Sequence, residues 1–328
     1  MPLNEFDIIK KYFTRPSTKK SVNKSVGDDC AIVSLAKNKQ LVMSMDTLVS
    51  ARHFPVTATP YQIATRALCT SLSDLAAMGA NPLWFTLGLT LPNVDEMWLK
   101  SFSEGLFSIA NAFDIDLIGG DTTRGPLTVT VQVHGEVDQG KALLRSCAQI
   151  GDAIFVTGCL GDGAAGLAML QNQLPVNKTT RNYLLSRFYA PTPHILAGKS
   201  IASFANSAID ISDGLLADAG HIAVASGVGM EINIECLPIA KLVKQVAADS
   251  CIEWALTGGD DYQLLFTVSP QQLPNVQSLL DQGMIKASHI GEVVDGDGQA
   301  SNGRVSCFLQ GAPYDISDLN TGYQHFVT

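Results

Sequence analysis

The chain has 328 residues, more than one ordinary domain, which predicts two domains of roughly 150 residues each. With 46% hydrophobic and 16% charged residues, it is too apolar for a disordered protein and too aperiodic for a fibrous one. The net charge of −9 argues against a nucleic acid or an anionic membrane as partner. The N-terminal segment contains no apolar signal-like run, no stretch approaches 18 apolar residues, and the seven cysteines form no C-x-x-C, so we expect a cytoplasmic protein.

The first half alternates between strand-like and helix-like segments. In chain order we expect a strand at 41–45, a helix that begins at Pro60 and stops at Gly79, a second helix over 94–113, and a half-buried strand over 127–134. Thr59 suits the N-cap of the first helix, Pro60 its first position and Gly79 its end.

The pattern pauses in a polar segment over 139–151, which predicts a boundary between domains at 1–140 and 141–328. The second half then mixes predicted strands at 152–158, 230–234 and 264–268 with predicted helices at 163–170 and 215–226. Both halves are therefore expected to be α/β or α+β.

Aspartates lie at the ends of apolar runs or within them in five segments, at 27–31, 44–47, 72–80, 119–123 and 210–214. Asp74 shares a helical face with Ile63, Ala67 and Thr70, where an unpaired ion would be costly. Few Lys or Arg residues are close to these positions in the sequence. Because Mg²⁺ prefers carboxylate oxygens and is commonly shared with phosphates, the set predicts a metal–phosphate site.

Each of these aspartates also has an ordinary structural interpretation. Asp46 and Asp121 follow predicted strands and would then cap turns. Asp213 precedes a predicted helix and would then be its N-cap.

Residues 161–166 fit the pattern G-x-G-x-x-G between a predicted strand and a predicted helix, which is the setting of a dinucleotide-binding loop. However, residues 174–180 contain no Asp or Glu to bind a ribose. Close packing of helix against strand, or a contact with part of the substrate, is the favoured interpretation.

Together with His53-Phe54, Arg124-Gly125 and Gly258-Gly259-Asp260-Asp261-Tyr262, the five aspartate segments resemble, in order and over nearly the whole chain, the thiamine-monophosphate kinase family. The resemblance implies an α/β (α+β), two-domain fold like that of aminoimidazole-ribonucleotide synthetase. Its N-terminal domain would bind ATP and Mg²⁺, and its strands would form a barrel across a homodimer interface; the C-terminal domain would be α/β. The implied reaction transfers the γ-phosphoryl group of ATP to thiamine monophosphate, giving thiamine diphosphate and ADP, with several Mg²⁺ ions.

The resemblance also implies roles for individual residues. By motif position, the metal ligands would be Asp29, Ser44, Met45, Asp46, Asp74, Asp121, Asp210 and Asp213, with Asp46, Asp121 and Asp210 as the catalytic candidates. ATP would contact Gly120, Asp121, Arg145 and Ser212, and thiamine monophosphate would contact His53, Asp260 and Tyr323.

Some of these positions have alternatives or depart from the family pattern. Arg145 is alternatively a solvated charge, and His53 a capping or packing residue. Met45 replaces the more usual Thr, so its metal contact comes from the backbone carbonyl or one ion is held differently. Asp260 replaces the usual Glu, so its contact must reach one methylene further.

Two other functions fit the same motifs. The first is another ATP-using enzyme of the superfamily, although residues 1–25 and the tail at 325–328 contain no cysteine of the kind that selenophosphate synthetase or the hydrogenase-maturation dehydratase uses. The second is a non-catalytic nucleotide-binding relative, for which Met45 and Asp260 are the only hints.

Overall fold

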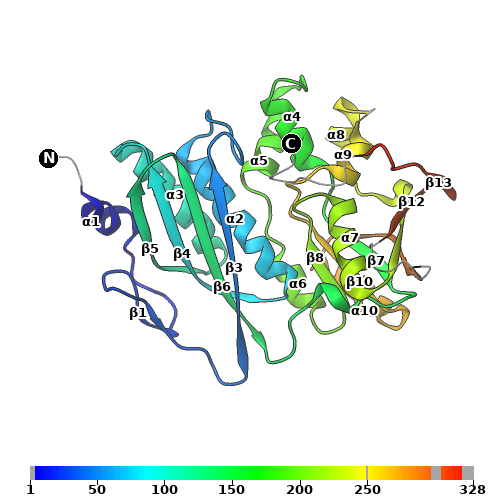
Figure 1. Ribbon diagram of the computed structural model, residues 1–328, viewed down its shortest axis with the longest axis horizontal. Coiled ribbons are helices and arrows are strands. Elements are labelled where there is room, and N and C mark those ends of the chain that lie inside the picture. Colours follow the sequence, from blue (N-terminus) through cyan, green and yellow to red (C-terminus); the bar gives the residue numbers. More distant parts are fainter. Residues whose placement is uncertain (1–3, 249, 297–303, 320–328) are drawn as a thin grey trace. The chain divides into compact units, whose positions relative to one another are not determined.

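The computed structural model describes residues 4–248, 250–296 and 304–319. The chain divides into two compact units, Met1–Leu75 with Ala80–Lys141, and Ala76–Gly79 with Ala142–Thr328. Figure 1 shows the elements of both. None of the described helices combines the length and the hydropathy needed to cross a bilayer.

The first unit is built on a four-stranded sheet in the order β3-β6-β4-β5. Its strands are β3 (Lys39–Val49), β4 (Asn81–Leu91), β5 (Asp116–Arg124) and β6 (Thr128–Asp138). Strand β6 runs antiparallel to both β3 and β4, and β5 runs parallel to β4. Strands β3 and β5 are therefore the two edges, and the sheet of the single chain is open.

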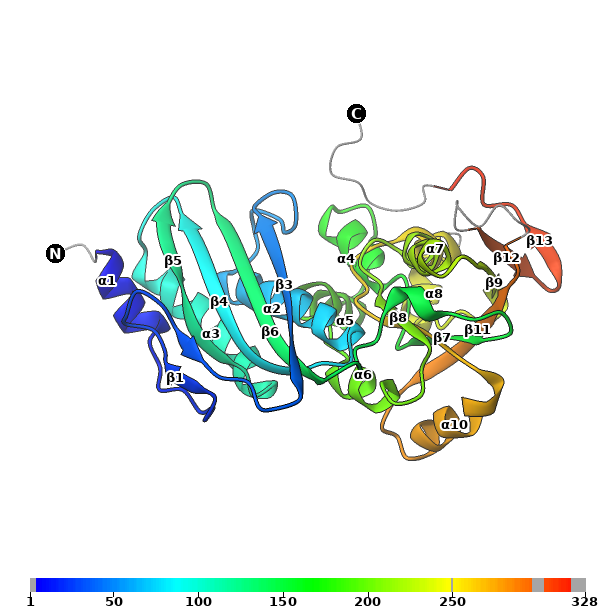
Figure 2. The ribbon, with the colours of Figure 1, turned by 60° about the horizontal axis from the view of Figure 1, so that its bottom comes forward.

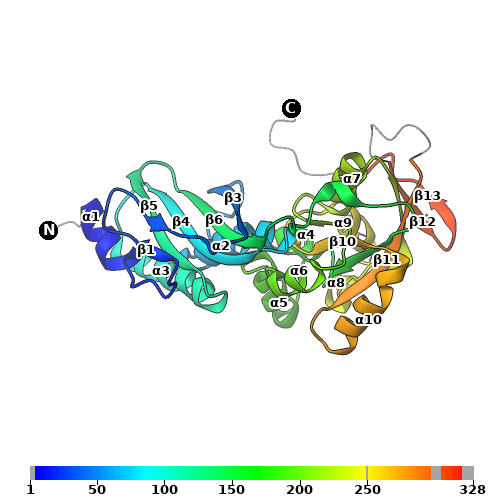
Figure 3. The ribbon, with the colours of Figure 1, turned by 90° about the horizontal axis from the view of Figure 1, so that it is seen from below.

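Helices α2 (Pro60–Ala77) and α3 (Glu96–Ala112) lie on one side of this sheet (Figure 3). Helix α2 is buried on nearly all sides between Ile63 and Ser73, and its start is fixed by reciprocal bonds in which Gln62 N donates to Thr59 Oγ1 and Thr59 N to Gln62 Oε1. The short elements α1 (Glu5–Ile8), η1 (Ile9–Phe13), β1 (Val22–Lys24) and β2 (Ile32–Val33) precede the sheet.

The second unit contains a seven-stranded sheet in the order β13-β12-β9-β11-β7-β10-β8. The strands are β7 (Ala153–Thr157), β8 (Ser207–Asp210), β9 (Gly229–Asn233), β10 (Leu264–Val268), β11 (Ala287–Val294), β12 (Val305–Leu309) and β13 (Ala312–Tyr314). Strand β10 lies between β7 and β8 and runs antiparallel to both. All residues of these three strands are buried.

Helices pack around this second sheet (Figure 2). They are α4 (Asp162–Leu170), α5 (Lys178–Tyr189), α6 (Ile195–Ile201), α7 (Leu215–Ser226), α8 (Lys241–Val246), α9 (Cys251–Thr257) and α10 (Leu273–Asp281), with short turns η2 (Arg145–Cys147), η3 (Ile234–Cys236) and η4 (Pro270–Gln272). Apolar residues of α7, including Leu215, Ala219 and Ile222, complete the main core with the sheet.

The predicted elements are present with small shifts at their ends, but the ordinary structural interpretations of three aspartates are wrong. Asp46 and Asp121 lie inside β3 and β5 rather than after them, because both strands continue beyond their apolar stretches. Asp213 does not cap α7: the N-cap is Gly214, with a φ of 121°.

Candidate functional site

In the first unit, polar side chains of β3 and α2 face each other on the helix-covered side of the sheet. Ser44 Oγ donates a short hydrogen bond to Asp74 Oδ2, and Ser71, whose Oγ donates a 3.2 Å bond to Ala67 O, lies beside the Asp46 carboxylate. Ser44 and Asp46 are two residues apart on a strand, and Ser71 and Asp74 are three apart on a helix, so each pair shares a face. The structure thus brings Ser44, Asp46 and Asp74 together.

This group of oxygen atoms is held in a partly dry environment. Burial raises the pKa of the Asp46 carboxyl above its usual value, and the neighbouring Ser71 hydroxyl opposes that shift only in part. The ionised form of Asp46 therefore costs free energy in the fold unless a cation compensates it. Two carboxylates and a hydroxyl form a donor set that suits Mg²⁺, a hard cation that prefers oxygen ligands.

Met45 lies between Ser44 and Asp46, and its side chain points to the opposite face of the sheet, where it is 61% exposed. Its side chain therefore does not join the Ser44–Asp46–Asp74 group. Any contact of Met45 with an ion at that group has to come from its backbone.

The other predicted ligands of the first unit lie elsewhere. Asp121 is exposed on β5, at the sheet edge opposite to Asp46; three strand spacings separate the two strands by about 14 Å. Asp29 is exposed in the segment between β1 and β2. A pocket of about 440 Å³ lies just beyond Asp121 and is lined in part by Thr122, Thr123 and Arg124.

His53 follows β3 and is half-buried. Its Nδ1 accepts a 2.9 Å hydrogen bond from Val49 N, so the neutral ring carries its proton on Nε2. Its carbonyl oxygen accepts a 2.9 Å bond from Arg66 Nε of α2. These bonds fit the alternative interpretation of His53 as a capping or packing residue, and they fix its orientation.

In the second unit, three loops meet where the neighbouring strands β7, β10 and β8 have their ends. This place is called the loop edge of the second sheet. Strands β7 and β8 end there and β10 begins there, because β10 runs antiparallel between them. The loop after β8 is bonded to the segment before β10: Asp260 N donates to Ser212 O at 2.9 Å and Tyr262 N to Ile211 O at 2.8 Å. This edge brings together the predicted residues Asp210, Ser212, Asp213 and Asp260.

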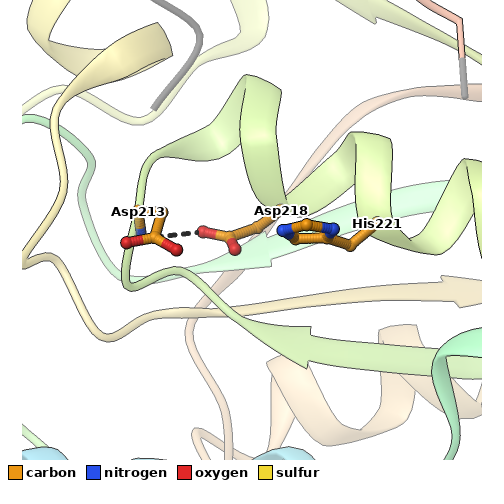
Figure 4. A group of neighbouring side chains, drawn as sticks. All are labelled: Asp213, Asp218 and His221. Carbon is orange, nitrogen blue, oxygen red and sulfur yellow. Dashed lines mark hydrogen bonds between the residues drawn. The ribbon is translucent and has the colours of Figure 1, made fainter. Parts of the chain in front are cut away.

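Asp218 of α7 fixes the loop that contains Ser212 and Asp213. Its Oδ2 atom accepts hydrogen bonds from the backbone N–H groups of Ser212, Asp213 and Gly214 at 3.1, 3.1 and 3.2 Å. Burial raises the pKa of Asp218 to about 7, although the backbone donors favour its charged form. Asp213, Asp218 and His221 hold potential ligand atoms within 4.8 Å of one another (Figure 4).

Arg145 lies at the other end of helix α7. Its side chain is exposed, and its carbonyl oxygen accepts a 2.8 Å bond from Ser226 Oγ, in the last residue of α7. Ser212 and Asp213 precede the first residue of that 12-residue helix, which is about 18 Å long. The structure therefore does not bring the backbone of Arg145 close to them. Tyr323 lies outside the described residues.

Sequence reasoning missed Asp218 and Asp261. Asp218 occupies the first turn of a helix, where an acidic residue usually interacts with the helix dipole, and this reading conceals its role. Asp261 lies next to the predicted substrate residue Asp260, yet Asp261 is the buried one of the two. The signal that could have identified Asp218 is that it is the one carboxylate in a mostly apolar helix, five residues after Asp213.

Comparisons with known proteins show the family to which this chain belongs. Residues 27–137 match the model of the AIR synthase related protein N-terminal domain, and residues 149–303 match that of the C-terminal domain. The thiamine-monophosphate kinase of Escherichia coli strain K12 is 45% identical over 332 residues, covering 100% of both chains. The chain belongs to the thiamine-monophosphate kinase family.

Solved structures of the thiamine-monophosphate kinase family have the same fold. The crystal structure of the Stenotrophomonas maltophilia K279a protein is 39% identical and has a TM-score of 0.83, covering 90% of this chain and 93% of that chain. A structure described as "AaThiL complexed with AMPPCP and TMP" is 31% identical and has a TM-score of 0.76, with 98% and 96% covered.

In this thiamine-monophosphate kinase family member, the G-x-G-x-x-G loop meets a carboxylate of its own chain. Gly161 N and Gly163 N donate hydrogen bonds of 2.6 and 2.9 Å to the two oxygens of Asp261. A Cβ at Gly163 would lie 2.6 Å from the backbone of Asp260. The second glycine thus serves close packing, although against the irregular segment before β10 rather than against a strand, and the backbone donors that a dinucleotide phosphate would need are engaged.

Proposed function

We propose that this chain carries out the reaction of its family, the ATP-dependent phosphorylation of thiamine monophosphate to thiamine diphosphate. The observation that carries the proposal is the 45% identity with a thiamine-monophosphate kinase over the full length of both chains. The two groups of acidic residues, at β3 and α2 and at the loop edge of the second sheet, suit a reaction between two polyanions.

Magnesium would be held by Asp29, Ser44, Asp46, Asp74, Asp121, Asp210 and Asp213 and by the backbone of Met45. The raised pKa of Asp46 and the bond between Ser44 and Asp74 support this proposal, because they form an oxygen-rich group that a cation would stabilise. Bound Mg²⁺ would offset the negative charge of the triphosphate and of the transferring phosphoryl group.

The remaining residues would bind and orient the substrates. Gly120, Asp121, Arg145 and Ser212 would contact ATP, and Asp46, Asp121 and Asp210 would be the carboxylates closest to the chemistry. His53, Asp260 and Tyr323 would contact thiamine monophosphate, whose cationic thiazolium ring suits a carboxylate. The acceptor phosphate is already anionic, so its orientation matters more than a strong general base.

We also infer a homodimer with a barrel across its interface. In the described part of the chain no further strand pairs with the outer sides of edge strands β3 and β5, and Leu41, Met43 and Met45 are 40%, 57% and 61% exposed on the open face of the sheet. Joining two sheets edge to edge would put Asp46 and Asp121 of the partner subunit on neighbouring strands. A solution mass equal to that of one chain would contradict this arrangement.

The cytoplasm is the proposed location, since ATP is available there. All seven cysteines are free, as is usual in a reducing compartment.

The proposed activity predicts one product from one acceptor. With ATP, Mg²⁺ and thiamine monophosphate, the purified chain should form thiamine diphosphate and ADP in equal amounts, measured by chromatography. A chelator should abolish the reaction, and excess Mg²⁺ should restore it. Unphosphorylated thiamine is the control acceptor and should give no product.

Two results would point to the alternatives. Phosphorylation of a different acceptor would indicate another enzyme of the superfamily, and ATP binding without turnover would indicate a non-catalytic relative.

A further inference from the structure

Asp261 is a deeply buried carboxylate in the segment before β10, at the loop edge of the second sheet. The residue is 4% exposed, and its two oxygens accept hydrogen bonds from Gly161 N and Gly163 N. A buried carboxylate is costly unless it is hydrogen-bonded, and burial raises the pKa of Asp261 well above its usual value. A position kept at this cost calls for a function.

The loop that Asp261 binds is itself anchored. Between the two glycines, Asp162 is buried, and its Oδ2 accepts a 2.5 Å bond from Tyr183 OH of α5. Arg187, on the same helix, places its Nε atom 3.4 Å from that oxygen. These contacts fix the 161–163 loop in place, so the hydrogen bonds from this loop to Asp261 also fix the segment that contains Asp261.

The segment that contains Asp261 has an unusual backbone. Asp260 and Tyr262 have φ angles of 69° and 51°, in the left-handed region that non-glycine residues seldom adopt. Such conformations are unfavourable and persist only where neighbouring contacts enforce them. Here those contacts are the bonds from Asp260 N and Tyr262 N to the loop after β8, and the two bonds of Asp261 to the glycine loop.

This backbone decides where the Asp260 side chain points. Tyr262 OH donates a 3.2 Å bond to Asp260 Oδ1, so the residues on either side of Asp261 contact each other. Asp260 is one methylene shorter than the Glu usual in its family, and a shorter side chain depends more on its backbone position.

We propose that Asp261 is a positioning residue, which holds the 260–262 turn against the Gly161–Gly163 loop so that Asp260 meets thiamine monophosphate. The inference rests on the proposed function, in which Asp260 contacts that substrate. The proposal also gives the glycine-rich loop a role. Its backbone N–H groups bind the Asp261 carboxylate and thereby orient Asp260, the residue proposed to bind the substrate.

The test compares Asp261→Asn with a matched control, Asp152→Asn. Asp152 is also a buried aspartate, and it accepts bonds from Asn206 and Thr267 at the opposite end of β7 and β10. Both variants should lose stability in thermal unfolding. Only Asp261→Asn should lower kcat/KM for thiamine monophosphate, by about 10- to 100-fold, as expected for a misplaced contact, while KM for ATP changes less than about threefold.

A double-mutant cycle separates positioning from general damage. In an Asp260→Ala background, Asp261→Asn should lower kcat/KM for thiamine monophosphate by less than about twofold further, because the contact that it positions is already absent. Additive effects, equal losses for both substrates, or the same loss in Asp152→Asn would overturn the proposal.

A milder variant keeps the test valid if Asp261→Asn does not fold. Gly161 has a φ of 81°, and an added Cβ would lie 3.2 Å from Ala255 N, so Gly161→Ala should displace one donor. It should show the same loss, smaller in size and absent in the Asp260→Ala background. An inactive wild-type chain would instead contradict the proposed function itself.

Discussion

Asp46→Asn should lower kcat by about 10³-fold or more while the chain still folds. The neutral amide keeps the shape of the side chain but removes one charge from the proposed metal group with Ser44 and Asp74. Loss of several kcal/mol of charge stabilisation in the transition state is expected, and about 4 kcal/mol corresponds to 10³-fold. Steady-state kinetics at saturating Mg²⁺ measures the effect, and Asp121→Asn should behave alike. Near-normal kcat would refute the assignment.

In the absence of metal, Asp46→Asn should not lower the stability of the fold, although it lowers kcat. Since the pKa of Asp46 is raised in the fold, its contribution to stability is fully present below the ordinary carboxyl pKa of about 3.9 and is lost as pH rises through the raised value. In chelator at neutral pH, Asp46→Asn should therefore unfold at a temperature no lower than that of the wild type. Asp138→Asn is a suitable control, because Asp138 is exposed at the end of β6 and pairs with Lys39.

Gly120→Ala should disrupt the sheet of the first unit at the position next to Asp121. A Cβ at Gly120 would lie 2.0 Å from the carbonyl oxygen of its register partner Leu87, and φ is 152°. Such a clash cannot be relieved by rotating a side chain, so β5 has to move away from β4. We expect the free energy of unfolding to fall by about 3 kcal/mol and Tm to fall by roughly 10 °C. We also expect at least about tenfold lower kcat.

The adjacent glycine is the matched control for this experiment. A Cβ at Gly119 would meet only Thr86 Cγ2 at 3.7 Å, an ordinary contact. Gly119→Ala should keep stability within about 1 kcal/mol of the wild type. Equal unfolding temperatures for the two variants would show that the close approach of β5 to β4 is not what requires Gly120.

Element boundaries were predictable where local chemistry sets them. Thr59, Pro60 and Gly79 marked the ends of α2, and the structure confirms that helix at Pro60–Ala77. The end of β3 was not predictable, because Asp46 is a polar residue at a position facing α2, and such a residue resembles the end of a strand. Its compensating neighbours come from a helix about 25 residues further along the chain.

The candidate site was predictable as a set of residue types but not as an arrangement. The apolar helical face around Asp74 indicated a carboxylate in need of a partner, and Ser44 fills that need through tertiary contact. The roles of Asp218 and Asp261 could not be predicted, because they come from burial against the backbone of other loops. Nothing in the residues next to them determines that burial.

The loops at the edge of the second sheet are joined through amide and carbonyl groups together with Asp218 and Asp261. Side chains such as Ser212, Asp213 and Asp260 can accordingly be exchanged without removing those bonds. In such a framework, one set of groups maintains the conformation of the loops, and a different set of side chains determines which ligand binds. This framework offers a physical route by which related chains could acquire different acceptors on an unchanged backbone.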